Sequence, residues 1–370
     1  MKNKKIKVAI VGVGNCAKAL IEGVAYYKNN DTTQGLMHPE IGGYKVTDIE
    51  FVEGFDIDYR KINKPLYHAI YENPNCSKNL TTLKDRIILP NVNIRVSPAP
   101  IFDSMSSSMY DDNIDEYSRF AHYSDNSFEK ESERINYVHK LIKVIKPDVI
   151  VNFLPVGSQK ATEFWAEICL KYGISFVNCI PVFIASDEEW NRKFKESKVA
   201  IIGDDIKSQF GASILSQMLQ ELAKDRGIKT LCHIQRNVGG NTDFLNMMDK
   251  NRLISKKISK EGVINGSDFV YAGPSEYISY LKDNKIADIH IEMEGFAGSK
   301  MSLDCKLSVQ DSPNSAGVVV DAIRFVKLAQ ERGVYGSLFG ASALLCKHPN
   351  LNMPYDEAKD EVDHFLNRWE

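Results

Sequence analysis

The sequence predicts an α/β protein, with a doubly wound parallel sheet in its larger part and a separate, inserted α+β unit. Four short apolar runs alternate with helix-like segments, and this alternation is typical of parallel strands joined by crossover helices. Those runs span residues 7–11, 147–155, 174–181 and 199–203. Farther along, residues 286–294 and 300–311 alternate apolar and polar side chains at period two, which predicts two adjacent strands of a second sheet with one polar face.

Length, charge and cysteine usage restrict the class of protein. A chain of 370 residues is long enough for two domains, and 43% apolar with 26% charged residues is ordinary for a globular protein. The net charge of −3 gives no basic excess for binding nucleic acid or a membrane surface. No apolar run approaches the ~18 residues of a membrane-spanning helix, and the N-terminal run is too short for a signal peptide. We therefore expect a cytoplasmic protein whose seven cysteines are reduced.

A glycine turn follows the first apolar run and opens an apolar helix. Gly12 permits the tight turn, Gly14 lets the backbone approach a pyrophosphate, and Ala17 allows close packing of helix on strand. Asn15 and Cys16 lie at the start of that helix, whose unpaired N–H groups can bind an anion. Because strand, turn and helix occur together, the sequence predicts a Rossmann-type dinucleotide-binding unit.

The acidic residue expected to bind the cofactor ribose lies later than the fingerprint rule predicts. The candidate is Asp56, after an apolar run at 49–55, whereas the rule places it about 20 residues beyond the glycines. Residues 29–47 would then be an insertion between the first helix and the second strand. A carboxylate repels a 2′-phosphate, so Asp56 favours NAD over NADP. The alternative for Asp56 is a solvated strand end.

A second strand end faces the same predicted crevice, because ligands of doubly wound sheets bind beyond the carboxyl ends of the strands. It carries Leu154, Pro155, Val156 and Ser158, at the turn into the next helix. Residues 61–123, which precede this part of the chain, lack clear periodicity and are rich in polar and turn-forming residues. We expect them to form a surface excursion.

The turn at 203–212 combines acids with small residues. Asp204 and Asp205 could orient a lysine or a cation, and they could equally cap the helix that follows. Backbone amides near Ser208 and Gly211 could bind a phosphate at the N-terminus of that helix.

Two lysines four residues apart, Lys256 and Lys260, follow a predicted turn at 237–241 and a short helical pattern at 243–249. In a helix both ammonium groups would lie on one face, where each opposes the other's protonation unless an anion is supplied. Such a pair suits a phosphorylated, polyhydroxylated substrate, because one amine can hold the phosphate while the other exchanges protons with oxygen. The spacing alone also allows a solvated basic helix face.

These motifs together resemble the myo-inositol-1-phosphate synthase family in its shorter archaeal and bacterial form. The likeness covers nearly the whole chain, and several ordered motifs are more specific than any one alone. The matching segments are 10–17, 152–158, 203–208, 237–246, 255–260, 310–317 and 347–349. One departure concerns the phosphate turn, where longer members have Lys-Ser-Gly-Gln-Thr and this chain has Lys207-Ser-Gln-Phe-Gly-Ala. The identity of the phosphate-binding amides is therefore open.

The resemblance implies NAD-dependent isomerisation of D-glucose 6-phosphate to 1L-myo-inositol 1-phosphate, a step of inositol biosynthesis. In that family C5 is oxidised by NAD, the ketone acidifies the C6 hydrogen, the enolate attacks the C1 aldehyde, and NADH reduces C5 again. The resemblance also implies a homotetramer built on the second sheet and, by analogy with related shorter enzymes, a divalent cation of unknown identity. Two alternatives stay open: an NAD-dependent dehydrogenase of another phosphorylated or amino-acid-like substrate, and a nucleotide-sensing protein without catalysis.

Residue roles follow from the same resemblance. Lys256 matches the lysine near C5 and its oxygen, Lys260 matches a ligand of the substrate or its phosphate, and Lys285 and Lys347 match further substrate-contacting lysines. The acids implied to orient lysines and cofactor are Asp205, Asp243 and Asp311. The phosphate-binding residues implied are Ser208, Gln209, Gly211 and Lys260.

The chain is expected to divide into three segments. They are an NAD-binding Rossmann-type domain at 1–211, a catalytic and oligomerisation α+β domain at 212–313, and a C-terminal return to the first domain at 314–370. Near the last boundary, residues 312–317 are predicted to end the strand pattern and cap a helix at 318–332.

Overall fold

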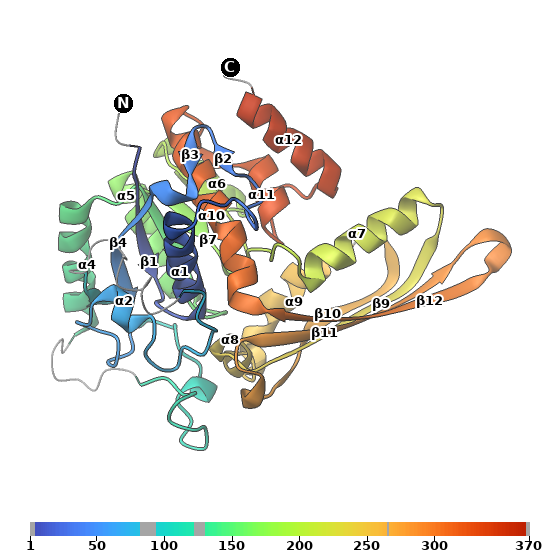
Figure 1. Ribbon diagram of the computed structural model, residues 1–370, viewed down its shortest axis with the longest axis horizontal. Coiled ribbons are helices and arrows are strands. Elements are labelled where there is room, and N and C mark those ends of the chain that lie inside the picture. Colours follow the sequence, from blue (N-terminus) through green and yellow to red (C-terminus); the bar gives the residue numbers. More distant parts are fainter. Residues whose placement is uncertain (1–3, 82–93, 122–129, 265, 368–370) are drawn as a thin grey trace.

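Two β-sheets and their helices make up the molecule, as the computed structural model shows (Figure 1). The structure describes residues 4–81, 94–121, 130–264 and 266–367. The larger sheet has helices on both faces, and the smaller sheet extends away from it with one helix along its length (Figure 1). The predicted α/β class, with a doubly wound sheet and a second inserted sheet, is confirmed. No helix in the described part of the chain is long and apolar enough to cross a membrane.

The larger sheet has the strand order β13-β8-β7-β6-β1-β4-β5, and each neighbouring pair runs parallel. Its strands are β1 (Ile6–Val11), β4 (Ile49–Asp56), β5 (Val96–Pro98), β6 (Val149–Asn152), β7 (Ser175–Asn178), β8 (Ala200–Ile202) and β13 (Gly336–Ser337). The four apolar runs of the sequence are β1, β6, β7 and β8, which are buried on both faces. The order reverses at β1, between β6 and β4, and this is the point where doubly wound sheets bind their ligands.

Helices on the two faces of this sheet bury two apolar clusters. One face carries α1 (Asn15–Asn29), α10 (Asp311–Glu331), α11 (Phe339–Leu345) and α12 (Tyr355–Asn367). The other carries α4 (Glu131–Ile145), α5 (Gln159–Tyr172) and α6 (Glu188–Glu196). The burial of both faces explains why the strands lack period-two alternation.

The smaller sheet has the strand order β10-β9-β11-β12. Its strands are β9 (Lys229–Gly239), β10 (Ser267–Tyr277), β11 (Asn284–Glu294) and β12 (Lys300–Gln310). β11 and β12 are adjacent, as the alternation predicted, and they pair antiparallel along their whole length. On one face Ile289 and Ile291 pack in a cluster with side chains of α7 (Ala212–Asp225), while Asp288 and His290 point to the opposite face.

Two local predictions are wrong. Asn237 lies in β9 rather than in a turn, because its backbone pairs with Pro274 of β10 and Ala287 of β11. Its side-chain Nδ2 also donates to the carbonyl oxygen of Gly273 at 2.9 Å. The helix expected from residue 318 begins at Asp311. Pro313 fits inside its first turn because the N–H that proline lacks would have no intrahelical partner there.

The insertion and the excursion both contain short helices and strands. Residues 29–47 include a hairpin of β2 (Glu40–Ile41) and β3 (Tyr44–Lys45), followed by η1 (Val46–Asp48). The excursion at 61–123 contains α2 (Leu66–Ala69), β5 and η2 (Ser107–Met109), while its residues 82–93 and 122–123 lie outside the described part. Between β9 and β10 the chain forms α8 (Thr242–Asn246), η3 (Lys250–Arg252) and α9 (Leu253–Glu261). The short helices of the second sheet are η4 (Ser279–Leu281) and η5 (Phe296–Gly298).

The division into three segments stays a proposal. It is supported by the second sheet, whose strands all come from residues 229–310, and by α10, which packs on α1 of the first sheet.

Candidate active site

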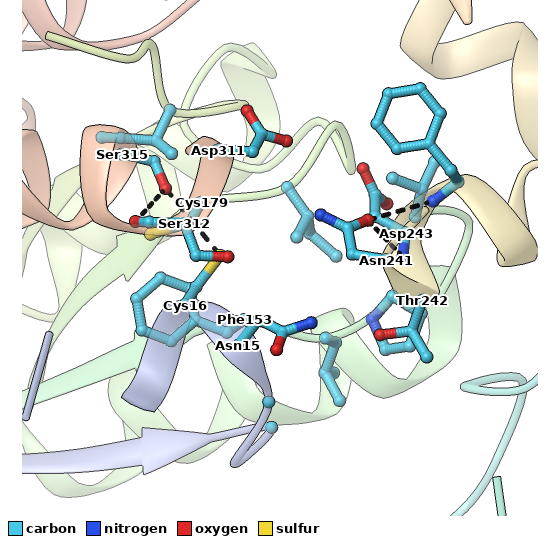
Figure 2. Close-up of a pocket in the computed structure, with 18 of the residues that line it drawn as sticks. Asn15, Cys16, Phe153, Cys179, Asn241, Thr242, Asp243, Asp311, Ser312 and Ser315 are labelled. Atoms are coloured by element: carbon cyan, nitrogen blue, oxygen red, sulfur yellow. Dashed lines mark hydrogen bonds between the residues drawn. The ribbon is translucent and has the colours of Figure 1, made fainter. Parts of the chain in front are cut away.

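A cavity lies where the carboxyl ends of the parallel strands meet α8, α9 and the first turn of α10 (Figure 2). Together with the open solvent at its mouth it spans about 1360 Å³. The predicted residues that line it are Gly12, Gly14, Asn15, Cys16, Asp56, Leu154, Pro155, Val156, Asp205, Ser208, Asp243, Lys256, Lys260, Lys285, Asp311 and Lys347.

Three helix starts contribute side chains to one space in Figure 2. Asn15 and Cys16 come from the start of α1, and Asn241 and Asp243 lie at the start of α8. Asp311, on the first turn of α10, completes the arrangement opposite α8. Segments that are more than 200 residues apart in the chain thus meet at the cavity.

Four predicted residues do not line the cavity: Ala17, Ser158, Gln209 and Gly211. Ala17 is fully buried in the core under α1, as the third small position of the fingerprint requires. The hydroxyl of Ser158 donates to the carbonyl oxygen of Pro155 at 2.6 Å and thereby holds its own turn. The amide Nε2 of Gln209 donates to the carbonyl oxygen of Gly35 at 2.6 Å, so this side chain contacts the insertion.

The glycine turn has the geometry that close approach of an anion needs. Gly12 has φ +86°, and a Cβ there would lie 2.7 Å from the carbonyl oxygen of Phe153. Gly14 has nothing within 4 Å of its ideal Cβ position and forms the N-cap of α1 without a side-chain hydrogen bond. The first N–H groups of α1 are therefore not capped by a side chain of this turn, and they can bind a pyrophosphate.

Asp56 is held by backbone amides at the end of β4. Its carboxylate accepts hydrogen bonds from the N–H of Val13 at 2.8 Å, of Ile57 at 2.7 Å and of Asp58 at 2.8 Å. The ammonium of Lys61 lies 3.6 Å from Oδ2 and donates to the carbonyl oxygen of Val13 at 2.9 Å. Asp56 thus links its strand to the glycine turn, and it lines the cavity where a ribose would follow the pyrophosphate.

The carboxylate of Asp205 accepts hydrogen bonds from two lysines. Nζ of Lys256 and Nζ of Lys347 each donate to Oδ1 of Asp205 at 2.9 Å, and the hydroxyl of Ser259 donates to Oδ2 at 2.7 Å. Burial raises the pKa of Asp205, but the two ammonium groups lower it by more, so its pKa lies well below the usual range. Asp205 is therefore ionised throughout the neutral range.

The other two lysines differ in their partners. Nζ of Lys285 donates to Oδ1 of Asp311 at 2.8 Å. Lys260 is 5% exposed and faces the cavity, and within the described residues its ammonium has no hydrogen bond or ion pair. An unpaired cation in such a place is costly, which makes its uncharged form more favourable.

The two lysines of α9 consequently have opposite pKa shifts. Burial lowers the pKa of Lys256, but the carboxylates of Asp205 and Asp243 raise it by more, so its net pKa is above the usual value. Burial, followed by repulsion from Lys285 and Lys256, holds the pKa of Lys260 well below the usual value. The sequence suggested that mutual repulsion would lower the pKa of both lysines. At Lys256 the carboxylates outweigh it, and at Lys260 it adds to the larger effect of burial.

Asp204 has a structural role that its sequence position did not reveal. Its carboxylate accepts hydrogen bonds from the amides of Ile184, Ala185 and Ser186, from the Ser186 hydroxyl and from Asn178. Burial raises its pKa to about 6. The described part of the chain contains no group of three or more His, Cys, Asp and Glu side chains that could hold a metal ion. The carboxylate of Asp204 therefore stabilises the fold through these hydrogen bonds, whereas that of Asp205 contacts the lysines.

The N-terminus of α7 is the predicted phosphate site, and of the residues predicted at this turn only Ser208 lines the cavity. Gly211 is its N-cap without a side-chain hydrogen bond, and a Cβ there would lie 2.7 Å from Cβ of Ser208. The amides of Gln209 and Phe210 are already used, because they donate to the backbone oxygen and Oδ1 of Asn314. The donors open to a phosphate are therefore the first amides of α7 and the hydroxyl of Ser208.

Sequence reasoning missed several cavity residues. The excursion, expected on the surface, contributes the fully buried Lys61 together with Ser104, Met109 and Phe120. No periodic pattern could have found them, because only the tertiary fold brings this irregular segment over the crevice. Asn241 also lines the cavity, and its side chain caps α8 by accepting from the amide of Asp243 at 3.1 Å. An Asn ahead of an acidic first turn was the available signal.

Comparisons with known proteins identify the family of the chain. The family model of myo-inositol-1-phosphate synthase matches residues 211–312, which include the lysine helix and the second sheet. The inositol-3-phosphate synthase of Corynebacterium glutamicum is 40% identical over 381 aligned positions, covering 99% of each chain. That of Mycobacterium tuberculosis is 41% identical and covers 98% of this chain and 96% of its own.

A solved structure shows the same fold. The myo-inositol-1-phosphate synthase-related protein of Thermotoga maritima superposes with a TM-score of 0.77 at 23% identity, covering 98% of both chains. Near-complete coverage at about 40% identity by the two bacterial enzymes decides the relationship. The chain therefore belongs to the inositol-3-phosphate synthase family.

Proposed function

We propose that this enzyme isomerises D-glucose 6-phosphate to 1L-myo-inositol 1-phosphate with NAD as an internally recycled cofactor. The observation that carries the proposal is the set of four lysines around Asp205 and Asp311, enclosed in one cavity with a glycine turn. A site for oxidation alone has no need of so many cations. Oxidation followed by enolate and alkoxide formation requires cations at several developing oxyanions.

The residues of the larger sheet fit NAD. The uncapped start of α1 and the open face at Gly14 would hold the pyrophosphate, and Asp56 would lie at the ribose and disfavour a 2′-phosphate. The nicotinamide would extend along Leu154 to Val156 toward α8 and α9. When bound, NAD accepts a hydride from C5 of the sugar and returns it at the end of the reaction.

The phosphate of the substrate would bind at the N-terminus of α7. The donors there are the first amides of the helix and the hydroxyl of Ser208. Lys260, which the resemblance implies as a phosphate ligand, lines the same cavity and would become a cation only after it has taken up a proton. Gln209 supports the turn from outside through its hydrogen bond to Gly35. A helix N-terminus favours the negative charge of a phosphate over that of an uncharged sugar.

The proton transfers follow from the charge of each lysine. Lys256 stays an ammonium because Asp205 faces it, so it stabilises negative charge on the C5 oxygen rather than accepting a proton. Lys260 has a lowered pKa, so its free amine accepts the proton of the C5 hydroxyl as the hydride leaves. Lys347, which shares Asp205, would face the C1 oxygen during ring closure.

We also propose that the enzyme is a cytoplasmic homotetramer. The resemblance implies this assembly on the smaller sheet, and α7 packs on only one face of that sheet, which leaves the other face open to a second copy. Light scattering on the eluting peak of a sizing column tests it, and a monomeric mass would contradict it. The divalent cation implied by the resemblance stays a prediction, which EDTA treatment and restoration of activity by Mg²⁺ or Zn²⁺ would test.

Phosphorus NMR of the products tests the function directly. Glucose 6-phosphate with substoichiometric NAD should yield an inositol monophosphate signal, while NADH absorbance stays at its baseline. Lasting NADH accumulation would instead identify a dehydrogenase. Binding of NAD without any reaction would support the nucleotide-sensing alternative.

A further inference from the structure

Arg252 lies at the junction between the lysine helix and the cofactor crevice. It is the last residue of η3 and immediately precedes α9, which carries Lys256 and Lys260. Its half-buried side chain reaches the turn that follows β6, where Val156 lines the cavity. The residue thus joins the element that holds the lysines to the element proposed to hold the nicotinamide.

Arg252 and Asn246 both donate to the carbonyl oxygen of Val156. Nη1 of Arg252 donates to the backbone oxygen of Val156 at 3.0 Å, and its Nη2 donates to that of Asp103 at 2.6 Å. The amide of Asn246, at the end of α8, donates to the same oxygen of Val156 at 2.9 Å. Two elements on the lysine side of the cavity therefore hold one residue on the cofactor side.

The turn leaves space for this guanidinium. Gly157 has φ +85°, and a Cβ there would lie 2.4 Å from Cδ of Arg252. On the far side, the carboxylate of Asp103 accepts from the amides of Lys160 at 2.9 Å and Ala161 at 3.1 Å, at the start of α5. The guanidinium thereby connects α9 to a segment that is itself anchored. A planar fork can reach two carbonyls at once, whereas a lysine supplies a single point charge.

We infer that Arg252 is a positioning residue that keeps α9 in register with the cofactor turn at Val156. The inference rests on the proposed function, in which Lys256 and Lys260 act on a sugar placed against the nicotinamide. Without the guanidinium, α9 retains its own hydrogen bonds but can shift relative to Val156. A misplacement of about 1 Å at reacting groups costs on the order of 100-fold in rate.

Hydrogen–deuterium exchange with NAD alone tests the inference without requiring turnover. In the wild type, NAD should slow exchange both in the glycine turn and in α9. In Arg252→Met the slowing in α9 should be lost, while that in the glycine turn and the dissociation constant of NAD stay close to wild type. Arg252→Lys, which keeps the charge and a single donor group, should show an intermediate effect and serves if the Met variant does not fold.

The matched control is Arg332→Met. Arg332 also donates to two backbone oxygens, those of Phe365 and Leu366, but in the contact between α10 and α12. This variant should leave exchange in α9 unchanged. Under turnover conditions, Arg252→Met should lower kcat on the order of 100-fold with little change in the KM for glucose 6-phosphate.

Three results would overturn the inference. The first is that NAD slows hydrogen–deuterium exchange in α9 of Arg252→Met as much as in the wild type. The second is a wild-type kcat in that variant. The third is that the variant loses the NAD-dependent slowing in the glycine turn as fully as in α9. If the wild type slows in α9 with NAD but makes no inositol phosphate, the proposed function fails while the positioning role of Arg252 stands.

Discussion

Replacing Asp205 by Asn separates the charge of the lysine cluster from its shape. The carboxylate accepts from Lys256 and Lys347 at 2.9 Å each and from Ser259 at 2.7 Å, and it is only 1% exposed. An amide has nearly the same size but no charge, and its nitrogen cannot accept a hydrogen bond. Both lysines then lose their common counter-charge inside a cavity of low dielectric.

The expected loss of unfolding free energy follows from removing one partner of a buried ion pair. Such a change costs roughly 3–5 kcal/mol, because a charge is left buried without its partner. Lys256 avoids part of this cost by losing its proton, since without Asp205 burial lowers its pKa. An uncharged Lys256 no longer stabilises the C5 oxyanion, and loss of one such donor lowers kcat about 10²- to 10³-fold.

The pH dependence of stability has a definite sign. The pKa of Asp205 is lowered, so its contribution to stability is present above about pH 4 and is lost as the pH falls through its folded-state pKa. The pKa of Lys256 is raised, so its contribution is present below about pH 10 and is lost as the pH rises through its folded-state pKa. Between these limits the wild-type contribution is constant, whereas Asp205→Asn, in which burial lowers the pKa of Lys256, should gain stability as the pH rises. The difference in unfolding free energy between the two proteins should therefore narrow toward high pH.

Inositol phosphate formation per folded molecule is the appropriate assay, with urea unfolding measured on the same samples. Asp321→Asn is a matched control, because Asp321 is also buried and pairs with Arg324 and His38 outside the cavity. It should lose stability and retain kcat. Wild-type kcat in Asp205→Asn would refute the assignment of Lys256 as a permanently charged group.

Three further changes test other parts of the site. Lys260→Arg, whose side chain stays charged, should lower kcat about 10²- to 10⁴-fold. In the wild type, kcat/KM should fall as the pH drops through the lowered pKa of Lys260. A kcat/KM that does not change with pH would contradict the role of Lys260 as a base. Gly12→Ala should abolish NAD binding measured by calorimetry, because its Cβ would lie 2.7 Å from Phe153 at φ +86°. Gln209→Ala should weaken phosphate binding less than Ser208→Ala does, and the reverse order would make Gln209 a direct ligand.

Local patterns in the sequence predicted much of the fold because they reflect short-range sterics and burial. β10 escaped prediction because Gly273 and Pro274 interrupt its pattern, and a proline is tolerated there since β10 is an edge strand. The turn expected at Asn237 is strand because cross-strand pairing with β10 and β11 overrides the local turn preference. Both errors concern contacts between segments distant in the chain.

In the candidate site, too, local spacing predicted some features and only the tertiary fold creates the others. The glycine turn and the pair Lys256 and Lys260 were visible in the sequence, since both depend on spacings within one strand–helix unit or one helix turn. The buried contribution of residues 61–123 was not visible, because an irregular segment has no period from which its burial could be inferred. The resemblance supplied the distant lysines at 285 and 347, which spacing alone could not connect to the cavity.

The sequence by itself determined where backbone can approach an anion and that two amines share one face of a helix. The tertiary structure decided whether each of these two amines is charged. Asp205 is 51 residues from Lys256 and 142 from Lys347, yet it lies within hydrogen-bond distance of both and not of Lys260. Electrostatic energies in a buried site change steeply over a few ångströms and with solvent exposure, and both quantities are set by packing rather than by local sequence.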